Sequence, residues 1–311
     1  MDNNNTRKYL QEILRSSGWS QELLANKLGV SFKTLNTWVN GRAVPRVKAL
    51  ATIEQVYYDI VGRGSVEADF LNKIKKQALN QKITLKEMLV NQELLDKITL
   101  HLTYHTNTIE GSTMTLQDVE DVIFDNKILT NRTTTEQVEA RNHKAALYFL
   151  LDTLQAKGRK FQWTEELLLA AHLRLLNGII TNAGYYRKHS VRVLGYRAVL
   201  ANFLKIPFLT NKLLQELNCP AKDIIGSLAK THAAFEQIHP FSDGNGRLGR
   251  LIMFIQALKY GLMPPLIVKE RKKAYYKYLE IAQMENKTDL LTLFIAEAIL
   301  FTNALLNNKP L

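Results

Sequence analysis

The sequence predicts an all-α protein, with a small N-terminal helical unit followed by a larger helical body. Apolar residues recur every three to four positions along most of the chain, which is the spacing of one face of an α-helix. Of the 311 residues, 46% are hydrophobic and 23% charged, a globular composition that excludes wholesale disorder. A chain of this length is expected to divide into about two domains.

The first unit is expected over residues 1–62 as four short helices. Ser20 is a good N-cap for the second helix, and Gly29 stands where that helix is expected to end. Ser31 can cap a third helix, which would bury Leu35. A short helix, a glycine turn and another short helix form the helix-turn-helix arrangement.

The rest of the chain is expected to form two further helical parts. Residues 63–162 are interpreted as a helical connector and residues 163–305 as a second body. Amphipathic helices are predicted at residues 134–156, 164–177 and 221–238.

One stretch departs from helical spacing. Its apolar residues lie among glycine and proline residues, which predicts a short β-hairpin, with an irregular surface loop as the alternative. The apolar residues concerned are Val191, Val193, Leu200, Phe203, Ile206 and Phe208.

Charge and composition indicate which kind of partner the protein binds and in which cellular compartment it is expected. The chain has 41 Lys and Arg against 29 Asp and Glu, a formal net charge of +12, so an anionic partner is expected, with a solvated basic surface as the alternative. A single cysteine, Cys219, excludes an intrachain disulfide. The apolar stretch 251–268 is interrupted by Gln256, Lys259 and two prolines, which predicts a buried helix. We therefore expect a cytoplasmic protein with no membrane partner.

The chemically richest run is HPFSDGNGRLGR, residues 239–250, between two predicted helices. Its glycines let backbone N–H groups converge at a helix N-terminus, where the helix dipole favours an anion. Arg247 and Arg250 are three residues apart and suited to clamp phosphate oxygens. Asp243 offers a hard oxygen ligand for Mg²⁺, and His239 a general base.

Simpler interpretations of this run fit less well. A dinucleotide-binding GxGxxG turn follows a strand, whereas the preceding segment is predicted to be helical. A Walker-type loop needs a lysine beside Ser or Thr after its last glycine, and a calcium loop needs a different acidic spacing. A helix start with surface arginines remains as the structural alternative.

The run 239–250 matches the signature of the Fic (Fido-fold) family, which the chain resembles over about residues 90–305. The resemblance includes residues 184–187 (GYYR) and the β-like segment. It implies a helical bundle with a β-hairpin flap, which transfers AMP from ATP, with Mg²⁺, to a Tyr, Ser or Thr hydroxyl of a protein. It implies that His239 is the general base and Asp243 the Mg²⁺ ligand. The implied nucleotide-binding residues are Gly244, Asn245, Gly246, Arg247, Leu248, Gly249, Arg250 and Tyr275, and the implied flap residues are Val193, Leu194 and Gly195.

A second resemblance concerns regulation. Residues Thr106 to Gly111 (TNTIEG) are similar to the inhibitory motif of the family. The resemblance implies that Glu110 pairs with Arg250 and occupies the γ-phosphate position, where a carboxylate repels a triphosphate. Two alternatives are a surface turn with an ordinary glutamate, and a glutamate that aligns a water for removal of AMP from a modified target.

Residues 20–45 resemble the phage-repressor type of helix-turn-helix domain; their sequence is SQELLANKLGVSFKTLNTWVNGRAVP. The resemblance implies a recognition helix from Ser31 to Trp38 and function as a homodimer, because one such domain binds DNA weakly. A docking module without DNA binding is the alternative. The residues implied to lie near DNA are Gln21, Phe32, Lys33, Thr34, Asn36 and Arg42.

The leading hypothesis from the sequence is an autoinhibited protein adenylyltransferase with a DNA-binding-like N-terminal domain. The alternative from another class is a DNA-binding regulator whose Fic core senses nucleotide. Transfer of AMP to the protein itself, removal of AMP, and transfer of another phosphate-containing group also stay open.

Overall fold

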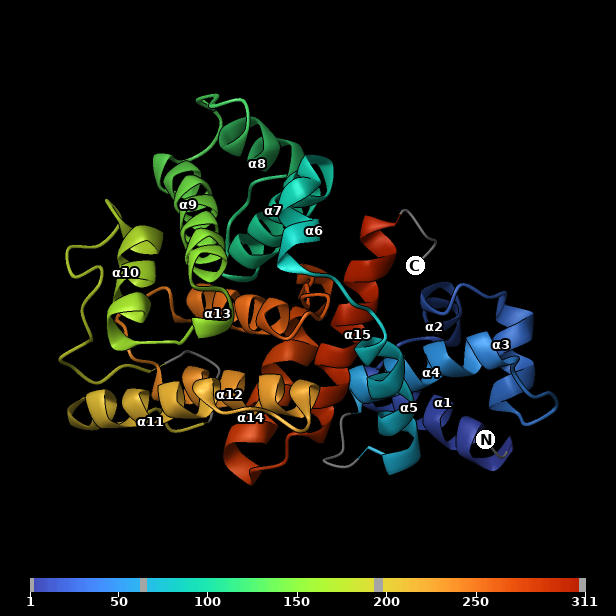
Figure 1. Cartoon of the computed structure of the whole chain (residues 1–311). Helices are drawn as coiled ribbons and strands as arrows, with labels where there is room; N and C mark the ends of the chain where they lie inside the picture. The colour runs from blue at the N-terminus through green and yellow to red at the C-terminus, as the bar shows by residue number, and fades with distance from the viewer. Residues whose placement is uncertain (1–2, 62–65, 193–197, 308–311) are drawn as a thin grey trace. The chain divides into compact units, whose positions relative to one another are not determined.

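The computed structural model describes residues 3–61, 66–192 and 198–307. Within these ranges the chain contains no strand and one isolated antiparallel bridge, between Lys82 and Leu262, so the all-α prediction is confirmed for them. The chain divides into two compact units, Met1–Val66 and Glu67–Leu311 (Figure 1). Each unit is described by itself.

The first unit is a bundle of short helices in which α1 packs on α3 and α4, and α2 packs on α3. Ser20 and Ser31 begin α2 and α3 as predicted, because their side chains accept hydrogen bonds from Leu23 N and Thr34 N. Gly29 follows α2 with a left-handed φ of 66°, which glycine adopts freely. The helices are α1 (Asn3–Ser17), α2 (Gln21–Lys27), α3 (Phe32–Val39) and α4 (Val47–Ile60).

The second unit is a larger helical body organised around α13, which is buried along nearly its whole length. Helices α12 and α9 pack on α13, and Figure 1 shows α13 passing between them. In the described residues of this unit, short 3₁₀ turns connect longer elements: η1 (Gly158–Lys160), η2 (Phe203–Lys205) and η3 (Lys269–Arg271). The α-helices are α5 (Ala68–Leu79), α6 (Leu85–Val90), α7 (Gln92–Ile109), α8 (Leu116–Ile123), α9 (Thr134–Lys157), α10 (Glu165–Leu176), α11 (Ile206–Asn218), α12 (Ile224–Ile238), α13 (Asn245–Lys259), α14 (Lys272–Glu285) and α15 (Asp289–Leu306).

Helix α15 is long and apolar enough to cross a membrane by length and composition alone. It packs instead against α5, α12 and α14 within the second unit, and 56% of its apolar window is buried there. This burial is typical of a core helix, whose apolar surface faces other helices on several sides.

The predicted β-hairpin is wrong for Phe203, Ile206 and Phe208, which lie in η2 and at the start of α11. Val191 and Leu200 are not in a strand either. Asn202 caps η2 by accepting a hydrogen bond from Leu204 N, and Pro207 occupies the first turn of α11, where its missing N–H costs nothing. Ile206 and Phe208 are two residues apart and would share one face of a strand, but in the helix Ile206 is buried and Phe208 is 72% exposed. The predicted flap residues Val193, Leu194 and Gly195 lie outside the described residues.

Candidate active site

The run from His239 to Arg250 joins α12 to α13 through two residues with left-handed backbones. His239 ends α12 with φ 48°, and Gly244 precedes α13 with φ 78°. A Cβ at Gly244 would collide with Leu176, so both the backbone conformation and the space require glycine there. Asn245 closes the loop, because its side chain accepts from Phe241 N and donates to Phe241 O, both at 2.9 Å.

This loop lines a pocket of about 220 Å³ together with the end of α7 and one face of α14. The pocket brings together predicted site residues that are far apart in the sequence. Those that line it are Glu110, His239, Asp243, Gly244, Asn245, Gly246, Arg250 and Tyr275. The other predicted nucleotide-binding residues, Arg247, Leu248 and Gly249, do not line the pocket.

His239 is positioned to act as a base. Burial lowers the pKa of its imidazole, so the ring is neutral near pH 7 and can accept a proton. Its Nδ1 lies 3.3 Å from the carbonyl oxygen of Glu236. The backbone beneath it is fixed by the buried Arg187, whose side chain donates to the carbonyl oxygens of His239, His189 and Ala201 at 2.6–2.7 Å. A guanidinium is well placed there, because the C-terminal end of a helix carries partial negative charge.

Arg250 and Glu110 form an ion pair inside the pocket. Arg250 Nη2 lies 2.6 Å from Glu110 Oε1, with 2% of the arginine side chain and 31% of the glutamate side chain exposed. Arg250 also donates through Nε to Thr106 Oγ1 and through Nη2 to Thr106 O. Both ends of the Thr106–Gly111 segment therefore hold the same guanidinium. The glutamate carboxylate lies against Gly246, where any Cβ would collide with it.

Arg247 takes a different position from Arg250. Its side chain is buried and pairs with Glu139 Oε1 at 2.6 Å and Asp243 Oδ2 at 3.2 Å. In this arrangement Arg247 orients the carboxylate of Asp243, whose Oδ1 accepts from Gly244 N at 2.6 Å.

Asp243 fits the requirements for holding one Mg²⁺ ion. Its side chain is 54% exposed and lines the pocket, so the carboxylate is accessible. Mg²⁺ is commonly bound by one or two carboxylates, with phosphates and water completing its shell. In the described part of the chain, no group of three or more His, Cys, Asp or Glu residues gathers into a site built from protein ligands alone.

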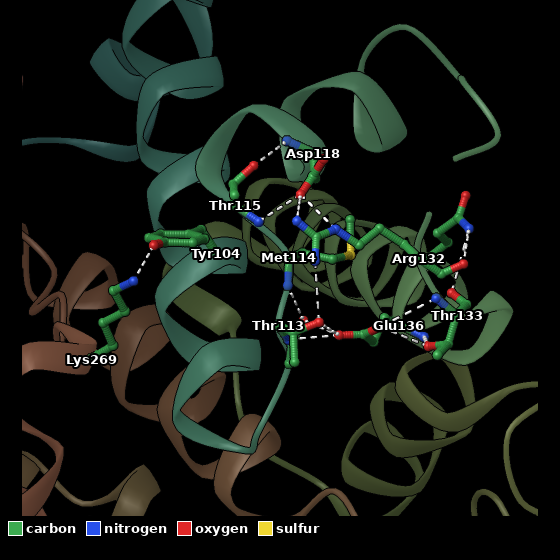
Figure 2. Close-up of polar contacts among 11 residues, drawn as sticks. Tyr104, Thr113, Met114, Thr115, Asp118, Arg132, Thr133, Glu136 and Lys269 are labelled. Atoms are coloured by element: carbon green, nitrogen blue, oxygen red, sulfur yellow. Dashed lines mark hydrogen bonds and ion pairs between the residues drawn. The ribbon is translucent and has the colours of Figure 1, made fainter. Parts of the chain in front are cut away.

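The segment after Glu110 is anchored to the start of α9 by Glu136 (Figure 2). Glu136 Oε1 accepts from Thr113 N at 2.6 Å and from Thr113 Oγ1 at 2.9 Å, and Glu136 Oε2 accepts from Thr133 Oγ1 at 2.8 Å. These hydrogen bonds, with the bond from Thr113 N the largest cause, lower the pKa of Glu136 to about 2.

Two further contacts hold the elements on either side of that segment. Arg132 pairs with Asp118 at 2.6 Å, at the start of α8. Lys269 donates to Tyr104 Oη, which ties α7 to η3, as Figure 2 also shows. Glu110 thus stands between two fixed segments.

Sequence reasoning missed two carboxylates at this site, Glu139 and Glu236. Glu236 lines the pocket and is 9% exposed. Its signal in the sequence is a charged residue on the buried stripe of α12 that also contains Leu228 and His232, four residues apart. Glu139 gives no such signal, because its partner Arg247 lies on another helix.

In the first unit, the residues predicted to contact DNA lie at the start of α3 and beside it. Phe32, Lys33 and Arg42 are exposed, and Thr34 is half-buried. Asn36 donates through Nδ2 to Gln21 Oε1 at 3.2 Å, so these two residues hold α2 and α3 together.

The chain is similar to known proteins in both units. Residues 162–257 match the Fic/DOC family, and residues 10–57 match the helix-turn-helix family. A relative named "Protein adenylyltransferase Fic" from Culex quinquefasciatus is 30% identical over 183 residues, which cover 58% of this chain and 36% of that protein. The chain therefore spans little more than a third of the length of that relative.

Two solved structures have the same fold over most of the chain. A Fic family protein from Desulfovibrio desulfuricans G20 has a TM-score of 0.62 at 25% identity and covers 77% of this chain and 74% of its own. A Fic domain containing signaling protein from Bacteroides thetaiotaomicron has a TM-score of 0.61 at 21% identity, covering 78% and 98%. The chain therefore carries a Fic/DOC family domain, preceded by an N-terminal helix-turn-helix domain.

Proposed function

We propose that this protein is a protein adenylyltransferase that is held inactive by Glu110. It would transfer AMP from ATP to a Tyr, Ser or Thr hydroxyl of a protein target. The observation that carries the proposal is the 2.6 Å ion pair between Arg250 and Glu110, inside the pocket that His239 and Asp243 also line. The name shared by the distant relatives supports the choice of reaction.

In the proposed reaction, the neutral imidazole of His239 accepts the proton of the target hydroxyl. The hydroxyl oxygen then bonds to the α-phosphorus, the bond from that phosphorus to the bridging oxygen breaks, and pyrophosphate leaves. Asp243 would hold the Mg²⁺ ion, whose charge neutralises phosphate oxygens. The N–H groups at the start of α13 favour an anion, and Arg250 would bind the terminal phosphate once Glu110 has moved away.

Glu110 blocks this reaction by charge and by position. Its carboxylate neutralises Arg250 and repels the phosphates of a nucleotide that would bind in the same place. The inhibition therefore depends on a single side chain, and replacing it by glycine is expected to activate the enzyme.

Intact-mass measurements test both parts of the proposal. We would incubate wild type, Glu110→Gly and His239→Ala with ATP, Mg²⁺ and a cell lysate as a source of targets, with Glu285→Gly as a control for glycine at an exposed helix end. We expect addition of AMP to be strongest in Glu110→Gly and absent in His239→Ala. Equal modification by wild type and Glu110→Gly would remove the inhibitory role, and no modification by any variant would contradict the transferase itself.

A second candidate function is a DNA-binding regulator whose Fic domain senses nucleotide. It is favoured by the exposed Phe32 and Lys33 at the start of the capped helix α3. DNA affinity should then fall steeply with salt, and Lys33→Ala should reduce the salt slope by about 1. A regulator of this kind keeps its DNA response in His239→Ala, whereas the enzyme loses protein modification. Affinity no greater than that of a charge-matched control protein would exclude this function.

A further inference from the structure

A second carboxyl group shares the pocket with Glu110. Glu236 lies in the last turn of α12, and its Oε1 is buried without a hydrogen-bond partner in the described parts of the chain. Gly249 provides the space for it, since a Cβ at that position would lie 2.5 Å from Glu236 Oε1. The adjacent residue is Arg250, whose Nη1 is likewise buried without a partner. Glu236 and Arg250 both line the pocket, and each has one buried polar atom without a hydrogen bond.

Among the ionisable groups around it, Glu236 is the group whose pKa lies just above neutral pH. Burial raises the pKa of Glu236 to about 8, Arg250 opposes this shift, and Glu110 adds to it. The neighbouring histidines stay neutral, because burial lowers their pKa values, that of His232 to about 3. Burial raises the pKa values of the two pocket tyrosines, and Arg250 stays charged beside Glu110. The titratable and charged groups around Glu236 are His232 of α12, His239 at its end, Glu110 at the end of α7, Arg250 of α13, and Tyr275 and Tyr276 of α14.

We propose that Glu236 works as a neutral carboxylic acid that leaves the charge of Arg250 available to an anion. In the resting protein that anion is Glu110, and in the active protein it is the terminal phosphate of ATP. Glu236 is thus a positioning residue of the nucleotide pocket. The identity of the second anion rests on the function proposed above.

The physical reason is that Arg250 carries a single charge. If Glu236 were ionised, it would compensate this charge from within the protein, and a second anion would meet repulsion. A neutral carboxyl also keeps an O–H donor, whereas a carboxylate only accepts hydrogen bonds. Anion binding at Arg250 and protonation of Glu236 therefore favour one another. By linkage, binding of an anion at Arg250 should be accompanied by proton uptake at Glu236 wherever Glu236 is partly ionised in the free protein.

The test uses full-length Glu110→Gly, in which Glu110 no longer competes with ATP and Glu236 is the carboxyl group left beside Arg250. Isothermal titration calorimetry of ATP with Mg²⁺, in buffers of different protonation enthalpy, gives both affinity and proton uptake. Above the pKa of Glu236 in the free protein, ATP affinity should fall by up to about tenfold per pH unit, with uptake of up to about one proton. Glu110→Gly/Glu236→Gln should lose both effects, because the amide stays neutral and still donates. Glu110→Gly/Glu120→Gln, altered at an exposed position of α8, is the matched control and should keep both.

Several results would overturn the proposal. One is an unchanged pH slope and proton uptake in the Glu236→Gln double variant, and another is loss of ATP binding at every pH in that variant while its circular dichroism stays native. If the double variant does not fold, proton uptake by Glu110→Gly decides alone, and its absence refutes the idea.

The two proposals fail separately. Proton-linked ATP binding without AMP transfer would remove the transferase and keep the role of Glu236. AMP transfer with ATP binding that does not depend on pH would do the reverse. No ATP binding by Glu110→Gly at any pH would overturn both.

Discussion

Replacing Glu110 by glutamine should destabilise the second unit, because it removes the charge that compensates Arg250. Loss of one partner costs about 3–5 kcal/mol in a fully buried pair and about 0–1 kcal/mol in an exposed one. Arg250 is 2% exposed and Glu110 31%, and the pocket admits water on the glutamate side, so a value between these limits applies. We expect a loss of about 2 kcal/mol. For a unit of this size, that lowers the melting temperature by about 4–8 °C.

Thermal unfolding followed by circular dichroism measures this change. Added pyrophosphate should restore more stability to Glu110→Gln than to wild type, because the freed Arg250 binds an anion only in the variant. Glu285→Gln is the matched control. Glu285 pairs with Lys287 at 2.9 Å, and about half of each side chain is exposed, so we expect no measurable effect. A variant as stable as wild type, with equal pyrophosphate shifts in both, would refute the assignment of Glu110 as the compensating charge.

Three further predictions concern the second unit. Arg187→Lys should lower AMP transfer by Glu110→Gly about tenfold or more, because lysine cannot reproduce the fork that fixes the backbone at His239; an unchanged rate would contradict this. Gln256→Leu should cost about 1–3 kcal/mol in chemical denaturation followed by tryptophan fluorescence, since it leaves Trp163 Nε1 and Leu217 O unpaired; a change of less than about 0.5 kcal/mol would contradict it.

The third prediction in this group is acid sensitivity between about pH 7 and pH 5.5. Four buried histidines have pKa values in the folded protein below the unfolded value of about 6.5, so their contribution to the free energy of unfolding is present above that pH and is lost as the pH falls. Glu236 has a raised pKa, so its protonation on acidification restores part of that free energy. The net loss is about 3 kcal/mol, visible as a falling melting temperature, and a flat profile would contradict it. The histidines responsible are His105, His143, His172 and His232, whose pKa values burial lowers to about 3 or 4.

The parts of the fold that depend on neighbouring residues could be predicted from the sequence. Ser20 and Ser31 cap helices because a hydroxyl and an N–H three residues later are all that a cap needs. The predicted strand at Ile206 and Phe208 was wrong because that prediction depends on which side chains are buried, which neighbouring residues alone do not determine. Alternating apolar residues indicate a strand only if one face is buried, and here one residue packs in the core while the other is exposed at the first turn of a helix.

The loop of the candidate site, residues 239–250, could also be predicted from the sequence, but the ion pairs around it could not. Glycines, Asn245 and a helix start are local features of one run. The contacts of Arg250 with Glu110 and of Arg247 with Glu139 join residues more than 100 positions apart, and no periodicity encodes them. The resemblance to a family suggested the contact between Arg250 and Glu110, whereas no feature of the sequence suggested the contact between Arg247 and Glu139. The proposed role of Glu236 depends on its burial, which results from the packing of α12 on α11, α13, α14 and α15.

The strength of the Glu110 contact sets how strong the proposed inhibition can be. A contact worth about 2 kcal/mol favours the inserted state roughly thirtyfold, so ATP at about thirty times its intrinsic dissociation constant offsets it. Release need not unfold α7, because Thr106 and Glu136 hold the flanking segments through contacts of their own, and only a partly exposed side chain has to move. The ratio of ATP affinities between Glu110→Gly and wild type therefore measures the proposed inhibition directly. A ratio far above about thirty would mean that contacts beyond this one ion pair hold the pocket closed.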